Sequence, residues 1–217
     1  MIARALALAA LASACSNAND YAQATCALVD VSGTYADERP EMVNIIKRAL
    51  LPRMLPGDSL VVVRIDDDSY SKENLVGSLT LDHRPSRANA QKMQFSHTLT
   101  AFRAERGRSR YTDIRGGLML CGEYLVETGA AHRDIVLFSD MKEELRPGAK
   151  RELEPAELAG VRVAAMNVKK LREDSHDPAA YRQRLTAWQE HLAQTGATDW
   201  RVILEPDKLL AHLDRVR

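Results

Sequence analysis

The sequence has no excess of charge of either sign. Its 217 residues include 30 basic and 30 acidic side chains, so charge gives no reason to expect nucleic acid or an anionic membrane surface as a partner. Its six histidines do not have the spacing of zinc ligands. It also lacks the G-x-S-x-G elbow, the Walker loop and the G-x-G-x-x-G turn of common hydrolases and nucleotide-binding enzymes. These absences exclude the enzyme classes most easily recognised from sequence, and the length favours one domain of ordinary size.

The first residues have the features of an export signal. A positive charge at Arg4 precedes a largely apolar stretch, residues 5–14, which is too short to span a bilayer but typical of a secretory signal. Residues 11–15, Leu-Ala-Ser-Ala-Cys, resemble a bacterial lipoprotein signal, in which the cysteine becomes the lipid-bearing N-terminus. We therefore expect a signal peptide at 1–14, lipidation of Cys15 and a polar tether at 15–23. The alternative is ordinary cleavage after Ala14, which releases a soluble periplasmic protein.

Apolar runs alternate with helical patterns along the rest of the chain. Runs bounded by turn signals predict buried parallel strands at residues 26–29, 60–65, 134–140, 161–168 and 200–204. The run at 75–81 follows its predecessor too closely for a parallel return, so it predicts an antiparallel edge strand. Helical patterns begin at Pro40, Pro85, Thr112, Pro178 and Pro206. Residues 24–217 are therefore predicted to form one α/β domain, with a doubly wound, mostly parallel sheet and helices on both faces.

Polar residues lie at the ends of three of these elements. Asp30, Ser32 and Thr34 come directly after the first strand, Thr112 is the expected N-cap of a helix, and Asp140 ends another strand. In a doubly wound sheet these tips converge at one edge, where the ligand crevice lies. Their oxygen atoms suit Mg²⁺ or Mn²⁺ better than Zn²⁺. A polar strand end without metal is the alternative interpretation.

Together the three segments resemble the von Willebrand factor type A (vWA) domain, whose metal-ion-dependent adhesion site (MIDAS) is built from three loops. Residues 30–34, D-V-S-G-T, match the first loop, D-x-S-x-(S/T). Thr112, Gly117 and Leu118 match the second, T-x-x-G-x-A-L. Residues 135–140 match the third, I-x-L-(L/F)-(S/T)-D. The resemblance covers residues 22–217.

Two residues depart from the family pattern. Arg115 and Met141 stand where the family has glycine. Neither replacement removes an oxygen ligand. The departures leave the conformations of the two loops open, and they leave Arg115 free to shield the site or to reach an anionic ligand.

The resemblance implies that the hydroxyls of Ser32, Thr34 and Thr112 ligate Mg²⁺, with Asp30 and Asp140 coordinating directly or through water. A carboxylate of a protein partner, or of a cell-surface or peptidoglycan group, then fills the open position. The implied function is adhesion without catalysis, on the periplasmic side of a bacterial envelope. The lipid on Cys15 would be its only contact with the membrane.

Two other functions are compatible with the sequence. The run D-V-S-G-T also resembles D-x-D-x-T of haloacid dehalogenase phosphatases, although Ser32 replaces the acid that donates a proton there. A vWA scaffold with a non-functional metal site is the second alternative.

The remaining features have less specific interpretations. The acids at 66–68 and the arginines at 103–110 are interpreted as solvated, and residues 141–157 as a surface loop that contributes to specificity in one interpretation.

Cys26 lies about 13 Å down its strand from Asp30, and Cys121 lies about 13.5 Å down its helix from Thr112. The two cysteines thus lie at similar distances from the predicted site, but the sequence does not give the distance between the strand and the helix. A disulfide and two buried thiols are therefore equally compatible with the sequence.

Overall fold

The computed structural model describes residues 21–33, 35–166, 168, 171, 174 and 177–214. The expected signal peptide, Cys15, residues 15–20 of the tether and Thr34 lie outside the described residues. Among the described residues, no helix is long and apolar enough to cross a membrane.

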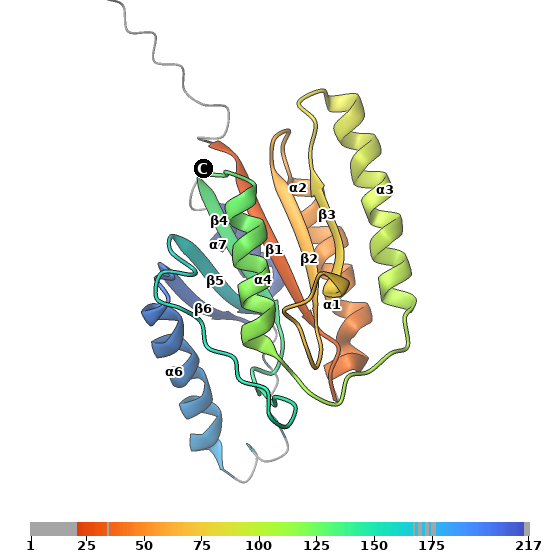
Figure 1. The fold of residues 1–217 in the computed structure, drawn as a ribbon. Helices are drawn as coiled ribbons and strands as arrows, with labels where there is room; N and C mark the ends of the chain where they lie inside the picture. Colours follow the sequence, from red (N-terminus) through yellow and green to blue (C-terminus); the bar gives the residue numbers. More distant parts are fainter. Residues whose placement is uncertain are drawn as a thin grey trace, which may run out of the picture.

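Six strands form one sheet in the order β3-β2-β1-β4-β5-β6 (Figure 1). Neighbouring strands are parallel, except that β3 runs antiparallel to β2 at one edge. The strands are β1 (Gln23–Asp30), β2 (Ser59–Ile65), β3 (Leu75–Thr80), β4 (His132–Phe138), β5 (Val161–Met166) and β6 (Asp199–Ile203). The predicted fold class is therefore confirmed. Two strands end two residues before their expected bounds. Strand β4 is shifted, so that it ends at Phe138 and Ser139 and Asp140 lie beyond it, and β5 ends at Met166 rather than at residue 168.

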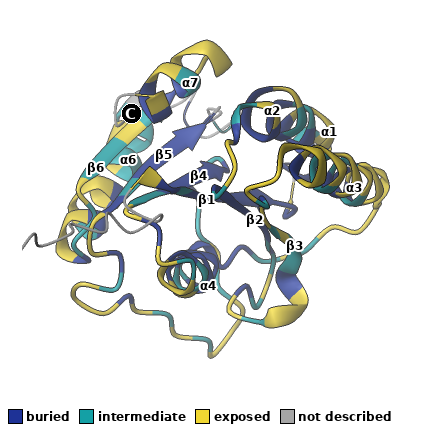
Figure 2. Ribbon diagram, turned by 90° about the horizontal axis from the view of Figure 1, so that it is seen from above, coloured by how far each residue is buried: buried dark blue, intermediate teal, exposed yellow. Residues whose placement is uncertain are grey.

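Helices cover both faces of the sheet (Figure 2). One face packs against α1 (Arg39–Ile45), the turns that extend it, α3 (Pro85–Ala104) and α7 (Pro206–Asp214). The other face packs against α4 (Ile114–Glu127) and α6 (Pro178–Gln194). Both faces of β1 are buried because its alternate residues enter the two cores: Ala27 and Val29 enter one, and Cys26 and Leu28 the other.

Helix α1 has an irregular end. It passes through a π-helical turn, η3 (Ile46–Leu50), into the short α2 (Leu51–Arg53). Pro52 lies in this last turn, and proline lacks the N–H that a regular helix uses. Single π turns of this kind accommodate such breaks in the hydrogen-bond ladder.

Helix α4 packs directly on β1 at Gly117. A Cβ atom built on Gly117 would come within 2.6 Å of Leu28 Cδ2, so a larger residue would require the Leu28 side chain to shift. One turn further along, Cys121 of α4 and Cys26 of β1 form a disulfide, with their Cα atoms 5.7 Å apart. Both cysteines are fully buried. The bridge, which the sequence left open, covalently joins the central strand to the helix that follows Thr112.

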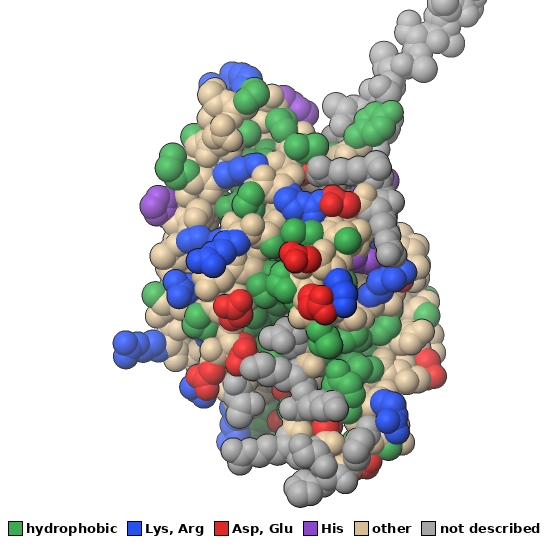
Figure 3. All heavy atoms as spheres, turned by 180° about the vertical axis from the view of Figure 1, so that it is seen from behind, with side chains coloured by type: hydrophobic (Ala, Val, Ile, Leu, Met, Phe, Trp, Pro, Cys, Tyr) green, Lys and Arg blue, Asp and Glu red, His purple; other side chains and the backbone are tan. Residues whose placement is uncertain are grey.

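The surface carries both signs of charge. On the face seen in Figure 3, basic and acidic side chains are interspersed among apolar ones rather than gathered by sign. This distribution agrees with the equal numbers of basic and acidic residues in the sequence.

Replacing Cys26 and Cys121 together with alanine should lower the free energy of unfolding. The bridge spans 95 residues, and removing a bridge of this kind costs about 2–5 kcal/mol, mainly because the unfolded chain is no longer constrained. Urea unfolding of the variant and of the wild type measures the difference, and the wild type under reducing conditions should match the variant. Reaction of both thiols in the denatured, unreduced wild type would contradict the bridge.

Candidate metal site

The candidate site lies at the carboxyl ends of β1 and β4. These two strands are neighbours, with Val29 paired to Phe138, so the residues that follow them emerge side by side. The chain leaves β1 toward β2 on one side, while β4 lies on the other. This is the topological switch point at which doubly wound proteins bind their ligands.

Asp30 is the centre of the site. Its Oδ1 accepts hydrogen bonds from the N–H of Ser32 at 2.8 Å and from the Ser32 hydroxyl at 2.6 Å. Its Oδ2 accepts from the Ser139 hydroxyl at 2.7 Å. Ser139 in turn accepts a hydrogen bond from the N–H of Met141. We did not predict a role for Ser139, although the third motif of the resemblance already contains a hydroxyl at that position.

The Asp30 carboxylate is buried without a cation. Only 1% of the residue is exposed, and its hydrogen-bond donors within the described residues are two hydroxyls and one backbone amide, all neutral. Burial raises the pKa of Asp30 to about 6; hydrogen bonds from Ser32 and Ser139 oppose the increase, and repulsion by Asp140 adds to it. Buried carboxylates are normally paired with a cation or a metal ion. The site therefore carries the buried negative charge that a bound cation would neutralise.

Thr112 joins Asp30 and Ser32 through its hydroxyl. Thr112 Oγ1 and Ser32 Oγ are 2.6 Å apart, and since the single Ser32 proton is donated to Asp30, the Thr112 hydroxyl donates to Ser32. The backbone of Thr112 forms a two-way bridge with Glu144, which fixes its position. All three residues are buried.

Thr112 is not the N-cap of α4, so that prediction is wrong. The cap is Asp113, whose side chain accepts the N–H of Gly116 at 2.8 Å. Both residue types cap helices well, and the carboxylate one position later takes the role. As a result, the Thr112 hydroxyl is left for the site.

Asp140 lies beyond the end of β4 and is half-buried. The N–H of Lys142 donates to Asp140 Oδ1 at 2.8 Å, and burial raises the pKa of the Asp140 carboxyl. Asp140 faces Asp30 closely enough for their repulsion to contribute to the raised pKa of Asp30. The structure thus brings together four of the five predicted ligands, and the fifth, Thr34, lies outside the described residues.

Met141 takes the backbone conformation for which the family uses glycine. Its φ is 65°, in the left-handed region that non-glycine residues rarely occupy. Two contacts hold it there: Trp188 Nε1 donates to the Met141 carbonyl at 2.9 Å, and the Met141 side chain is buried. The loop therefore keeps the glycine-like conformation without a glycine.

Arg115 is engaged by residues of α6 and of the loop after β4. Its guanidinium pairs with Glu143, donates through Nε to His191 at 3.1 Å and lies 5.5 Å over the Trp188 ring. These contacts tie α4 to α6 and to the loop after β4. Arg115 therefore holds together the elements that surround the candidate ligands.

The acids at 66–68 are less solvated than we expected. Asp68 pairs with Arg146 and Arg151, and Asp66 Oδ1 accepts hydrogen bonds from the Asp68 N–H and the Asn74 amide. The basic partners of Asp68 come from residues 141–157, and one of them, Arg151, also pairs with Asp113, so this loop packs across the beginning of α4. Only Asp67 of the three acids is exposed.

The donor set fits a hard divalent cation. Its atoms are carboxylate and hydroxyl oxygens, which Mg²⁺ and Mn²⁺ prefer. No group of three His, Cys, Asp or Glu side chains that would hold a metal gathers anywhere in the described part of the chain. A metal here would thus depend on the hydroxyls of Ser32 and Thr112 as well as on carboxylates.

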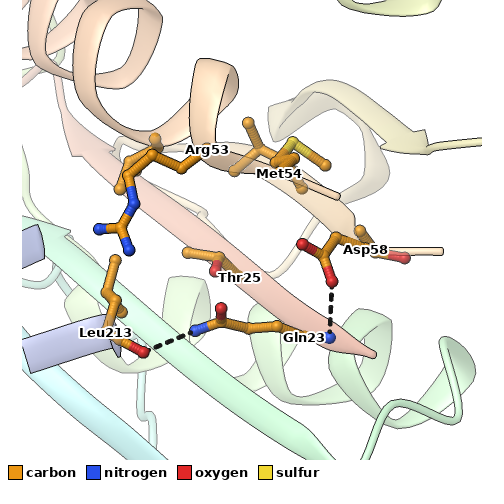
Figure 4. Close-up of a pocket in the computed structure, with 9 residues that line it drawn as sticks. Gln23, Thr25, Arg53, Met54, Asp58 and Leu213 are labelled. Atoms are coloured by element: carbon orange, nitrogen blue, oxygen red, sulfur yellow. Dashed lines mark hydrogen bonds between the residues drawn. The ribbon is translucent and has the colours of Figure 1, made fainter. Parts of the chain in front are cut away.

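A separate cavity lies at the opposite end of the sheet, at the start of β1 and β2 (Figure 4). There the N–H of Gln23 donates to Asp58 Oδ1 at 3.0 Å, and the Gln23 side-chain amide reaches the Leu213 carbonyl. Asp58 Oδ2 also accepts the N–H of Leu55. These groups bind the chain to itself and fix the beginning of β1, far from the strand ends that carry the candidate ligands.

Comparisons with family models and with curated proteins found no match for the sequence. Comparison with solved structures found similar folds. A mutant of the PilB minor pilin from Streptococcus sanguinis aligns with a TM-score of 0.52 and 11% identity, over 91% of this chain and 60% of that one. An aerotolerance-related membrane protein from Bacteroides fragilis aligns with a TM-score of 0.50 and 12% identity, over 89% and 97%.

The chain shares its doubly wound fold with these two proteins. Identities this low show the fold alone. A von Willebrand factor type A protein from Catenulispora acidiphila is also similar, with a TM-score of 0.47 and 14% identity, over 90% of this chain and 41% of that one. A TM-score below 0.5 supports no further argument. The chain thus spans less than two thirds of the minor pilin and of the von Willebrand protein.

The pKa of Asp30 predicts how metal-free stability depends on pH. The folded protein holds this proton more tightly than the unfolded chain, with a pKa of about 6 against 3.8, so stability falls as pH rises through this window and stays lower above it. A shift of this size corresponds to roughly 3 kcal/mol at pH 7. Asp30→Asn should remove this loss of stability at neutral pH.

Urea unfolding in EDTA at pH 4 and at pH 7 measures this effect. Asp30→Asn should be more stable than the wild type at pH 7, and the difference should disappear at pH 4. The matched control is Asp67→Asn, which removes an exposed carboxylate near the same edge and should retain the wild-type pH dependence. If Asp30→Asn lost as much stability as the wild type on going to pH 7, the assigned cause would be wrong.

Proposed function

We propose that this chain is a vWA-like adhesion domain that binds a protein partner through Mg²⁺, or Mn²⁺, held in a MIDAS. The proposed ligands are Asp30, Ser32, Thr34, Thr112 and Asp140. The observation that supports the proposal most strongly is the buried Asp30 carboxylate at the switch point of the sheet. Among the described residues its donors are all neutral, and the Ser32 hydroxyl links it to the Thr112 hydroxyl.

Each described ligand has a separate part in this proposal. Asp30 supplies the buried negative charge, and Ser139 holds it in place from the far side. Ser32 and Thr112 supply hydroxyl oxygens, and Asp140 supplies a second carboxylate at the more open side of the site. The bound ion supplies an open coordination position that attracts a carboxylate of the partner. The N-terminus of α4, which begins just after Thr112, adds positive potential at the same place.

An exported location is part of the proposal. The disulfide between Cys26 and Cys121 is typical of oxidising compartments and rare in the cytosol. It agrees with a signal peptide at 1–14, a lipid on Cys15, a tether at 15–23 and a vWA-like domain at 24–217. The proposed place of the chain is the periplasmic side of the envelope.

A phosphatase is disfavoured by the surroundings of Asp30. Where a haloacid dehalogenase has its proton-donating acid, this chain has Ser32, and that hydroxyl is already hydrogen-bonded to Asp30. The proposed activity is therefore binding without catalysis. A scaffold whose site needs no metal remains as the alternative that the experiments below must exclude.

Addition of Mg²⁺ should raise the melting temperature of the wild type. Binding to the folded state alone stabilises it by about 0.4 kcal/mol when the Mg²⁺ concentration equals Kd, and by about 2.7 kcal/mol at a hundredfold excess. Asp30→Ala should remove the increase and, because it relieves repulsion with Asp140, should be no less stable than the wild type in EDTA. Asp67→Ala should respond to Mg²⁺ like the wild type. An equal response in Asp30→Ala would place the metal elsewhere.

Partner capture tests the function itself. A pull-down from detergent-solubilised bacterial envelope should recover a protein partner in Mg²⁺ and lose it in EDTA. Asp30→Ala should also lose the partner, and Asp67→Ala should keep it. Capture that survives both EDTA and Asp30→Ala would favour the scaffold alternative over metal-mediated adhesion.

Labelling with a fatty-acid analogue tests the proposed anchor. The wild type expressed in bacteria should incorporate the label and fractionate with membranes, because Cys15 would carry the lipid. Cys15→Ser should remain unlabelled. A soluble, unlabelled mature wild-type protein would show ordinary cleavage after Ala14 instead.

A further inference from the structure

An arginine-rich segment borders the proposed metal site. Residues 103–110, which we call the arginine segment, contain four arginines and one glutamate. The Ser109 N–H donates to the Val31 carbonyl at 3.1 Å, and the Gly33 N–H donates to the Ser109 carbonyl at 3.0 Å. These bonds attach the segment to the loop that carries Ser32. Arg108 and Arg110 therefore flank a residue that is hydrogen-bonded to the metal-site loop.

A buried arginine fixes the shape of this segment. Arg39, in the first turn of α1, is 3% exposed, and its guanidinium donates to the carbonyls of Glu105 and Gly107, each at 2.5 Å. The same guanidinium lies 5.4 Å over the Phe102 ring. The first two residues of the segment end α3, and the irregular remainder is held at Glu105, Gly107 and Ser109. Its exposed side chains are thus presented on a fixed backbone.

The exposed charge of the segment is basic. Arg103, Arg106 and Arg110 are exposed, and a hollow beside them is lined by Arg39, Arg103, Arg106 and Arg108 together with two acids, Asp37 and Glu105. Those two acids are already neutralised, because Asp37 pairs with Arg108 and Glu105 pairs with Arg64. The remaining arginines give this surface a positive charge, whereas the whole chain is neutral.

We propose that the arginine segment is a second contact for the partner and that it selects an acidic peptide. One carboxylate of the peptide reaches the metal, and neighbouring Asp or Glu residues contact Arg106 and Arg110. An extended peptide advances about 3.3 Å per residue, so acids within a few residues of the metal-bound one fall on the segment. This inference rests on the proposed metal-dependent function. It adds a requirement for several clustered acids, which a metal alone does not impose.

The test compares two fluorescent peptides of equal length, one all-glutamate and one glycine-serine with a single glutamate. In Mg²⁺, Arg106→Glu/Arg110→Glu should bind the all-glutamate peptide about tenfold more weakly than the wild type, or worse, because two attractions become repulsions. Binding of the single-glutamate peptide should change little. The matched control, Arg48→Glu/Arg87→Glu, makes the same charge change on exposed helix positions away from the site and should bind both peptides like the wild type.

Thermal shifts with Mg²⁺ separate this inference from the proposed function. Arg106→Glu/Arg110→Glu should keep the wild-type shift, since neither arginine is a proposed ligand. If the shift is kept and the all-glutamate peptide binds undiminished, the arginine contact is refuted and the metal site stands. If binding requires the arginines but survives EDTA, the joint site is refuted. Arginine-dependent binding to vesicles of anionic lipid, with no binding of the peptide, would identify a membrane contact and overturn the proposal.

Discussion

The carboxylate of Asp30 is buried at the end of the central strand, and within the described part of the chain it accepts hydrogen bonds from neutral groups alone. The surrounding structure is arranged around that charge. Hydrogen bonds from Ser32 and Ser139 lower its energy, but they leave its pKa raised to about 6. A cation would complete the site by neutralising Asp30 together with Asp140. The burial that makes the metal-free site unfavourable at neutral pH is therefore also what makes it attractive to a cation.

The elements around Asp30 limit how the site can rearrange. The Cys26–Cys121 disulfide and the close contact at Gly117 hold α4 against β1, which fixes the position of Thr112 at the start of that helix. Met141 retains an unfavourable backbone conformation because Trp188 binds its carbonyl and its side chain is buried. Residues in unfavourable backbone conformations are frequent at functional sites, where the surrounding structure must hold them in place. The site is thus preorganised by two helices, α4 and α6, that pack on the same face of the sheet.

The alternation of strands and helices, the antiparallel edge strand and the polar strand ends followed from the sequence, because buried parallel strands are apolar runs whose ends are marked by polar residues. Adjacent residues that suit the same role were harder to separate: Thr112 and Asp113 both cap helices, and only the fold shows that Asp113 does so. The lateral distance between Cys26 and Cys121 could not be predicted, because it depends on how α4 packs on β1, where Gly117 contacts Leu28. Arg39 was equally unpredictable, because an arginine in a first helical turn is ordinarily solvated and here it binds the arginine segment.

Anomalous diffraction from a crystal soaked in Mn²⁺ would test the central claim most directly, because it locates the ion itself. The account predicts one strong peak in contact with the hydroxyls of Ser32 and Thr112 and beside the carboxylates of Asp30 and Asp140, and no such peak in a soaked crystal of Asp30→Asn. A peak among the acids at 66–68 with none at Asp30, or the same peak in both proteins, would contradict a metal site organised by the buried carboxylate.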